Sequence, residues 1–155
     1  MKKLIVFFIS VFILLQFFRT EENVQLKATD SDILIFEETS DEVSAIIKSS
    51  CYDCHSNYTN YSFIDKIFPI SLYVNNNIRN GKRVLNFSEW GDYTVLEREI
   101  AIVAIDFDVQ TERMPKKAYN WLHEEAKITE HEKKLIQDWV YSIRERLIKD
   151  NYPEM

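Results

Sequence analysis

The sequence predicts an all-α fold, and three observations support this. The chain of 155 residues contains only 2 glycines and 3 prolines, which are the residues that tight turns between β-strands require. Apolar residues recur at spacings of three and four, the period of helices with one buried face. Three segments begin with a threonine that a glutamate follows three positions later, as in a helical capping box. We therefore expect helices joined by loops around one core.

The chain begins with an apolar run. Lys2 and Lys3 precede apolar residues 4–18, and Arg19 follows them, which is the layout of a secretory signal. No cleavage site with small residues follows, so we predict that residues 1–18 form an uncleaved signal-anchor. This anchor would cross a membrane once, with the domain outside the cytoplasm. As a helix the run is only about 22 Å long, against about 30 Å of hydrocarbon, so the basic residues would have to snorkel. The alternative is a cleaved signal and a soluble periplasmic protein.

Two further regions follow this segment. Residues 19–38 are predicted to be a polar linker with one apolar island, residues 33–36. The island could pack on the edge of the domain or form a short strand. Residues 39–155 are predicted to form the folded domain, and the helical patterns lie in this part of the chain.

The first helix of the domain is expected to begin near Ser40. Thr39 and Glu42 fit a capping box, and apolar residues at helical spacing follow them. This helix leads directly into Cys51, so it should place that residue at its C-terminal end.

The middle of the domain is expected to be helical over residues 63–80, in two pieces that Pro69 divides. Gly81 is expected to end the second piece. Residues 85–91 then form a loop with two large aromatic side chains.

The last two helices have the clearest start signals. Thr94 with Glu97, and Thr129 with Glu132, each fit a capping box. Arginine and lysine gather near the end of the last helix, as its dipole favours. For the helix after Thr94 we predict an apolar stripe of Leu96, Ile100, Val103, Ala104 and Phe107.

Both cysteines of the chain lie in the sequence C-x-x-C-H, as Cys51, Cys54 and His55. This pattern is typical of c-type haem attachment, in which two thiols form thioethers with haem and the histidine binds iron. A redox disulfide would need a βαβ context, which the helical pattern does not offer. A zinc site would need four ligands, and the spacing of the remaining histidines does not suit one. We therefore predict a cytochrome c-like helical domain around one covalently attached haem c.

The second axial ligand is expected to be Met114. It is the only methionine away from the two chain ends, and it precedes Pro115 in a loop between two helices. A thioether opposite a histidine raises the reduction potential of haem iron and closes its open coordination position. The alternative ligand is His123, which could instead be a buried histidine that shapes the Met114 loop. His131 falls in the first turn of a charged helix and is expected to be exposed.

Beyond the C-x-x-C-H motif the chain resembles the bacterial haem-binding domain family, small membrane-anchored monohaem c-type cytochromes. The resemblance covers most of residues 39–149, and one departure is Phe63, where a tryptophan is expected. It implies thioethers at Cys51 and Cys54 and axial ligation by His55 and Met114. It also implies a single-pass anchor in a bacterial inner membrane, with the domain in the periplasm. The matching stretches are residues 51–57, Pro69, residues 85–90, Met114 with Pro115, Leu122 with His123, and the helix start at Ile128 and Thr129.

These observations predict one-electron transfer rather than enzymatic catalysis. The alternative is a peroxidase-like haem enzyme, or a redox or gas sensor with a displaceable distal ligand. The net charge of −6 disfavours a nucleic-acid partner and suits a redox protein with a basic docking surface. Four aromatic residues are expected to wall the haem, namely Tyr61, Phe63, Phe87 and Trp90.

Overall fold

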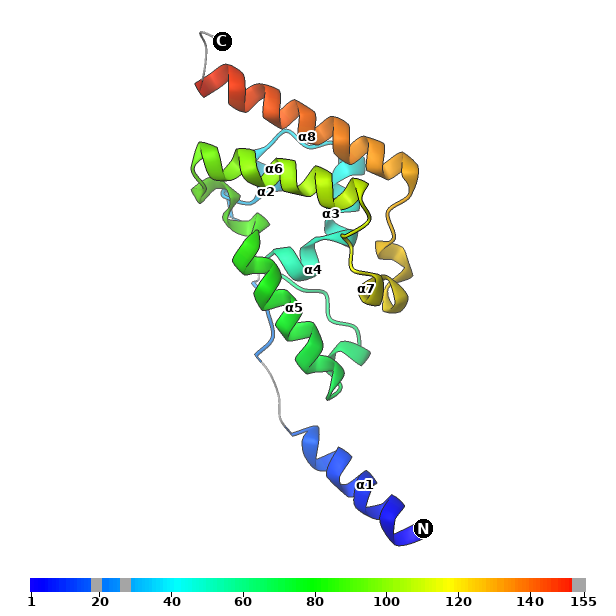
Figure 1. The fold of residues 1–155 in the computed structure, drawn as a ribbon. Helices are drawn as coiled ribbons and strands as arrows, with labels where there is room; N and C mark the ends of the chain where they lie inside the picture. Colours follow the sequence, from blue (N-terminus) through cyan, green and yellow to red (C-terminus); the bar gives the residue numbers. More distant parts are fainter. Residues whose placement is uncertain (18–20, 26–28, 152–155) are drawn as a thin grey trace.

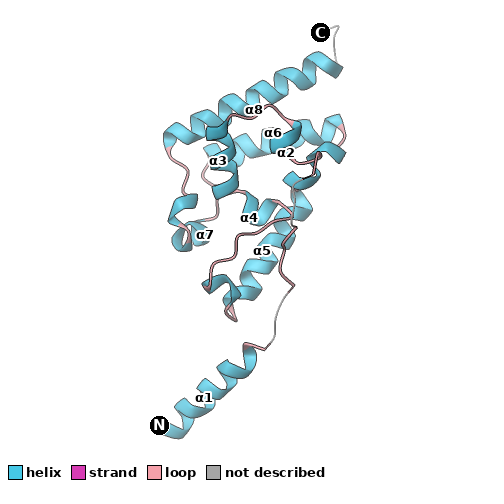
Figure 2. Ribbon diagram, turned by 180° about the vertical axis from the view of Figure 1, so that it is seen from behind, coloured by secondary structure: helices cyan, strands magenta, loops and turns pink. Residues whose placement is uncertain are grey.

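The computed structural model of the chain describes residues 1–17, 21–25 and 29–151. Residues 18–20, 26–28 and 152–155 lie outside the described part, and they include the end of the predicted anchor and portions of the predicted linker. Within the described ranges the structure consists of helices and loops without any strand, as Figure 2 shows. An isolated bridge pairs Val24 with Tyr58. The prediction of an all-α fold is confirmed.

Three helices enclose the core: α3 (Asp41–Ser50), α6 (Val95–Gln110) and α8 (Glu130–Asn151). Helices α6 and α8 run side by side, and α3 packs against α8 (Figure 1). Each helix turns one apolar face inward, so burial of that face stabilises the arrangement. The fully buried side chains at the centre include Ile47, Phe87, Trp90, Ile102, Ile136 and Ile143.

The start of α3 differs by one residue from the prediction. Ser40 is the N-cap, and its hydroxyl accepts a hydrogen bond from the Val43 N–H at 3.3 Å. Thr39 instead accepts a hydrogen bond from the Trp139 indole at 3.2 Å. Serine is the more favourable N-cap of the two, and the contact of Thr39 with α8 is compatible with this choice.

The other two predicted capping boxes are confirmed. At the start of α6 the Thr94 hydroxyl accepts from the Glu97 N–H at 3.3 Å, and Glu97 accepts from the Thr94 N–H at 2.7 Å. Thr129 and Glu132 form the same reciprocal pair, with the same two distances, at the start of α8. Each box satisfies backbone N–H groups that the first helical turn leaves without a partner.

The face of α6 that enters the core is not the predicted one. Ile102, Ile105 and Val109 are buried. Three residues of the predicted stripe lie on another side: Leu96, Val103 and Phe107 are 53–62% exposed. The other two, Ile100 and Ala104, line a cavity between α4 (Tyr52–His55), α5 (Ile70–Val84) and α6. The helix carries apolar residues on several sides, so spacing alone could not select the side that meets α8.

A close helix contact forms between α4 (Tyr52–His55) and α5 (Ile70–Val84). Gly81 was expected to end α5, but the helix continues past it to Val84. A Cβ atom at Gly81 would lie 2.3 Å from the Cys54 carbonyl oxygen. The glycine therefore serves close packing between two helices rather than helix termination.

The apolar island of the predicted linker is a short helix, α2 (Ile33–Phe36), and Ile33 is fully buried. It packs against the 3₁₀ helix η2 (Phe87–Asp92). The carboxylate of Glu37, just after α2, accepts from the Trp90 indole at 2.8 Å and pairs with Arg146 at 2.8 Å. Three further short elements belong to the domain: η1 (Ile64–Lys66), α7 (Lys117–Leu122) and η3 (Glu124–Ala126).

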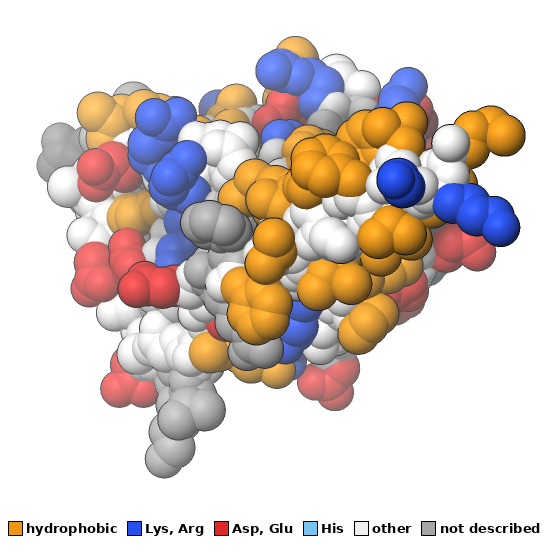
Figure 3. All heavy atoms as spheres, turned by 90° about the horizontal axis from the view of Figure 1, so that it is seen from below, with side chains coloured by type: hydrophobic (Ala, Val, Ile, Leu, Met, Phe, Trp, Pro, Cys, Tyr) orange, Lys and Arg blue, Asp and Glu red, His pale blue; other side chains and the backbone are white. Residues whose placement is uncertain are grey.

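The N-terminal helix α1 (Lys2–Leu15) lies apart from the other helices (Figure 1). Gln16, which follows it, accepts a hydrogen bond from the Phe68 N–H at 3.0 Å. Viewed from the side of α1, hydrophobic side chains gather in one broad area with basic side chains near its edges (Figure 3).

The predicted single-pass membrane anchor is wrong. Within the described ranges, no helix has both the length and the apolar content that crossing a membrane requires. Helix α1 has 14 residues. It is therefore about 21 Å long, whereas the hydrocarbon core is about 30 Å thick. The predicted localisation, a single-pass anchor of residues 1–18 in the inner membrane, is therefore wrong as well.

Candidate cofactor site

A cavity of about 550 Å³ lies between α4, α5, α6 and the segment that joins α6 to α7. This volume is in the range of small-molecule and cofactor pockets. Much of the wall is apolar, contributed by Val84, Leu85, Phe87, Ile100, Ala101, Ala104, Ile105 and Val109. Cys51, Cys54, His55 and Met114 also line it. Another hollow, of about 610 Å³ beside α5, has no cysteine, histidine or methionine among its described lining residues.

The two cysteines sit at the junction of α3 and α4. Cys51 is at once the C-cap of α3 and the N-cap of α4, and Cys54 lies within α4. Both are free thiols. Burial raises the pKa of Cys51 to about 12, with a contribution from Cys54. Burial and the nearby Asp53 raise the pKa of Cys54 to about 11. Both groups are therefore neutral thiols at neutral pH, which does not suit a redox-active thiolate pair.

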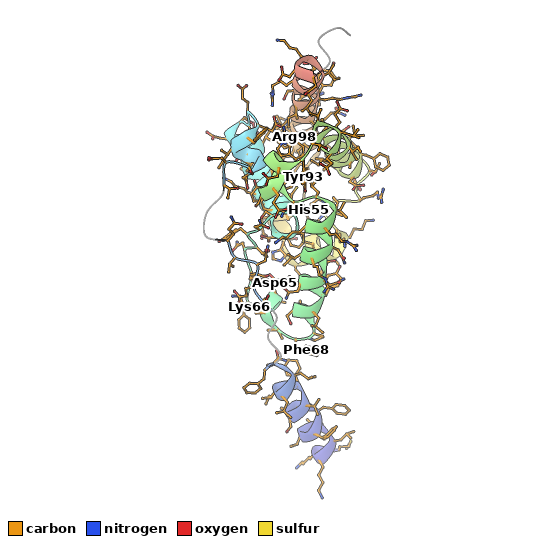
Figure 4. The ribbon with its side chains drawn as sticks, turned by 90° about the vertical axis from the view of Figure 1, so that its left-hand side faces the viewer. His55, Asp65, Lys66, Phe68, Tyr93 and Arg98 are labelled. Atoms are coloured by element: carbon orange, nitrogen blue, oxygen red, sulfur yellow. The ribbon has the colours of Figure 1, made fainter. Side chains whose placement is uncertain are left out.

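His55 ends α4 beside α5, and in Figure 4 it lies between the labelled Tyr93 and Asp65. Its Nδ1 is 3.0 Å from the Leu85 carbonyl oxygen. A carbonyl can only accept, so Nδ1 carries the proton and Nε2 keeps its lone pair. Burial lowers the pKa of His55 below its ordinary value of 6.5, and the Leu85 hydrogen bond offsets part of this change. A neutral imidazole with one nitrogen fixed by a carbonyl is the usual form of a metal-ligating histidine.

Met114 reaches the same cavity from the segment after α6. Its N–H donates to the Asp108 carbonyl at 3.0 Å, and the Arg113 N–H donates to the same oxygen at 2.9 Å. These bonds tie Met114 to the last turn of α6. The next residue, Pro115, is buried and also lines the cavity.

Charged side chains of both signs border the cavity. Arg83 and Lys116 are the cations of its lining, and Asp53, Glu97 and Asp108 are the carboxyl groups. Lys116 donates to the Asn77 amide oxygen at 2.9 Å. Guanidinium and ammonium groups at the edge of an apolar cavity can pair with carboxylates of a bound ligand.

His123, the alternative to Met114, does not line the cavity. Its side chain is 9% exposed, with Nε2 3.6 Å from the Asp65 carboxylate and Nδ1 3.4 Å from that of Glu125. His131 is exposed, as expected, and lies 3.7 Å from Glu42. Across the described residues, no group of three or more His, Cys, Asp or Glu side chains could hold a metal ion.

Only one of the four aromatic residues expected to wall the site does so. Phe87 lines the cavity, and its ring centroid is 6.0 Å from that of His55. Trp90 is buried in the core, where its indole binds Glu37. Phe63 is 80% exposed, and Tyr61 is absent from the lining.

The residues around the cavity fit a haem group. The apolar walls suit a porphyrin, and two thiols stand beside an imidazole whose free nitrogen can bind iron. A thioether from a distant part of the sequence completes the donor set, and two cations are available for carboxylates. Imidazole and thioether are established axial ligands of haem iron.

Several residues of the site escaped the sequence analysis. The Leu85 carbonyl that orients His55 is a backbone group, for which side-chain patterns give no signal. Tyr119 and Lys116 carried no motif. Gly81 did carry a signal, because a glycine inside a helical pattern either serves close packing or marks the end of the helix. We predicted the helix end, whereas the structure shows close packing.

Comparison with known families agrees with this geometry. The model of the haem-binding domain family matches residues 10–142, which is most of the chain. No curated protein and no solved structure matches the sequence. The chain therefore belongs to the haem-binding domain family and is a haem protein.

Proposed function

We propose that the protein is a monohaem c-type cytochrome that transfers single electrons. Cys51 and Cys54 would hold haem through thioethers, and His55 and Met114 would be the axial ligands of its iron. One observation carries this proposal: four donor side chains of the right chemistry, from two distant parts of the sequence, line a single cavity of about 550 Å³. His123 lies outside this lining, which supports Met114 as the second ligand.

The bound haem would supply an iron centre that gains and loses one electron. The residues around it control access and orientation. The Leu85 carbonyl holds the Nδ1 proton of His55, so that Nε2 is the only imidazole nitrogen free to bind. The bonds from Arg113 and Met114 to Asp108 keep the methionine segment against α6. With His55 and Met114 as the two ligands, little would have to rearrange when the haem gains or loses an electron.

The protein partner would be a redox protein with a basic docking surface. The net charge of −6 supports this choice, because opposite charges steer two proteins toward each other. Steering of this kind weakens with salt. The rate of electron exchange with a basic partner should therefore fall as ionic strength rises.

The mode of attachment tests the proposal first. The chain, isolated from cells that assemble c-type cytochromes, should keep its haem after denaturation and acid extraction. A variant with both Cys51→Ser and Cys54→Ser should release it under the same treatment. Haem that is extracted from the unchanged protein would contradict thioether attachment. A redox titration of the loaded protein should then follow a one-electron curve.

The alternative is a haem enzyme or sensor, which needs a distal position that opens readily. If the reduced, unchanged protein binds carbon monoxide more slowly than Met114→Ala does, the result supports electron transfer. Binding at the same rapid rate in both proteins would favour the alternative.

A further inference from the structure

Helix α7 begins just after Met114 and carries two side chains that bind other parts of the domain. Tyr119 lines the cavity, and its hydroxyl donates to the Asp53 carboxyl group at 2.5 Å. Asp53 lies between Cys51 and Cys54 in α4. The hydrogen bond therefore connects the methionine segment to the helix that carries both cysteines.

His123, at the end of α7, makes the second connection. Its ring stacks on that of Tyr119, with centroids 4.4 Å apart and an interplanar angle of 19°. Its Nε2 lies 3.6 Å from Asp65 in η1. Tyr119 and His123 together fasten α7 to two separate elements.

The partners of these side chains are themselves fixed. The other oxygen of Asp53 accepts the Asn60 N–H at 2.8 Å. The Ser62 N–H and hydroxyl both donate to Asp65, at 2.8 and 2.7 Å. Burial and the bond to Asp53 raise the pKa of Tyr119, so the phenol keeps the proton that it donates. Both carboxyl groups are thus held in place by other hydrogen bonds.

We propose that Tyr119 and His123 are positioning residues that hold Met114 at the cavity and so limit the access of small external ligands to the haem. This inference rests on the proposed axial ligation by Met114. On its N-terminal side Met114 is tied to α6 by backbone hydrogen bonds, which side-chain substitutions leave in place. On its C-terminal side the contacts nearest to Met114 are those of Tyr119 and His123, together with the exposed contact from Lys116 to Asn77. Further along the chain, η3 packs against α3.

If these side chains hold the segment in place, only a small fraction of the molecules has Met114 displaced from the haem at any time. A ligand such as carbon monoxide binds only this open population, so its apparent binding rate is proportional to the open fraction. Removing the Tyr119 hydrogen bond to the partly buried Asp53 carboxyl group should raise that fraction roughly tenfold. The closed form would still dominate, so the sulfur-to-iron charge-transfer band of the oxidised protein should persist.

The experiment compares haem-loaded, full-length variants in carbon monoxide binding after reduction and in the absorption spectrum when oxidised. Tyr119→Phe keeps the stacked ring but loses the bond to Asp53, and His123→Phe keeps the ring but loses the contact with Asp65. Tyr119→Phe should bind carbon monoxide roughly tenfold faster than the unchanged protein. His123→Phe loses a weaker contact, 3.6 Å long, and should also bind faster than the unchanged protein. Both variants should keep the band. Tyr141→Phe is the control for loss of a tyrosine hydroxyl, because Tyr141 is 60% exposed on α8 and does not line the cavity. It should bind at the rate of the unchanged protein.

Unchanged rates in both Tyr119→Phe and His123→Phe, with fast binding in Met114→Ala, would overturn the positioning role and leave the axial ligation intact. If Met114→Ala itself keeps the band and the slow rate, the ligand assignment fails, and the positioning role fails with it. If Tyr119→Phe does not accumulate in loaded form, the rate in His123→Phe decides.

Discussion

The partly buried imidazole of His55 shows how neighbouring groups set the state of a single side chain. The C-x-x-C-H motif predicts that His55 binds iron, but the motif does not explain why Nε2 rather than Nδ1 is available. The explanation is the Leu85 carbonyl, 3.0 Å from Nδ1, which fixes the tautomer. Burial adds a second effect, because it lowers the pKa and keeps the ring neutral.

This burial predicts a pH dependence for the haem-free protein. In the unfolded chain His55 takes up a proton near its ordinary pKa of 6.5, whereas in the folded chain it does so only at lower pH. The unfolded state therefore binds more protons below pH 6.5, and the contribution of His55 to stability is lost as the pH falls. Urea unfolding at about pH 7.5 and about pH 5.5 should show a lower free energy of unfolding at the acid pH.

Two substitutions isolate the contribution of His55. His55→Phe should reduce this pH dependence, because the titrating group is gone. His131→Gln removes an exposed histidine and should leave the dependence as it was. Equal pH dependence in His55→Phe and the unchanged protein would contradict the account.

At the scale of elements, the contact between α4 and α5 depends on Gly81. A Cβ atom there would meet the Cys54 carbonyl oxygen at 2.3 Å, and backbone cannot move aside as a flexible side chain can. In an exposed helix, Gly→Ala stabilises by about 1 kcal/mol through helix propensity. Here overpacking, which typically costs about 1–3 kcal/mol, opposes that gain.

We therefore expect Gly81→Ala to lower the free energy of unfolding, contrary to its effect on propensity. Arg79→Ala, at an exposed position of the same helix, should change it by less than about 0.5 kcal/mol. Chemical denaturation measures both. A more stable Gly81→Ala variant would show that the two helices do not pack as closely as the structure has them.

Helix α6 offers a second test at this scale, because its sequence pattern and its burial disagree. Ile102 is fully buried, whereas Leu96 of the predicted stripe is 62% exposed. Ile102→Ala should lower the free energy of unfolding by about 2–5 kcal/mol, the usual effect of truncating a buried aliphatic side chain. Leu96→Ala should lower it by less than about 1 kcal/mol. A larger loss of unfolding free energy in Leu96→Ala than in Ile102→Ala would contradict this arrangement and favour the predicted stripe.

These elements show what the sequence could and could not predict. The starts of α6 and α8 were predictable because a capping box is local, with Thr94 and Glu97 only three positions apart. At the start of α3, Ser40 rather than Thr39 is the cap, and Thr39 binds Trp139, a partner in a distant helix. The buried side of α6 and the role of Gly81 depend on neighbouring helices, so local spacing could not supply them.

For the whole molecule, the central feature is one cavity whose donors come from two regions of the chain. The motif supplied Cys51, Cys54 and His55, and scarcity of methionine selected Met114 as a candidate. That Met114 lines the same cavity as the motif, while His123 does not, required the tertiary structure. The predicted membrane anchor failed at this scale, because helix α1, with 14 residues, is too short to cross a bilayer.

The absorption spectrum of the oxidised, haem-loaded protein tests the central claim most directly. A methionine sulfur on haem iron gives a sulfur-to-iron charge-transfer band that two histidine ligands do not give. We predict that the unchanged protein and His123→Ala show this band and that Met114→Ala lacks it. A band that survives in Met114→Ala, or a sixth ligand that is lost in His123→Ala alone, would contradict the proposed haem site.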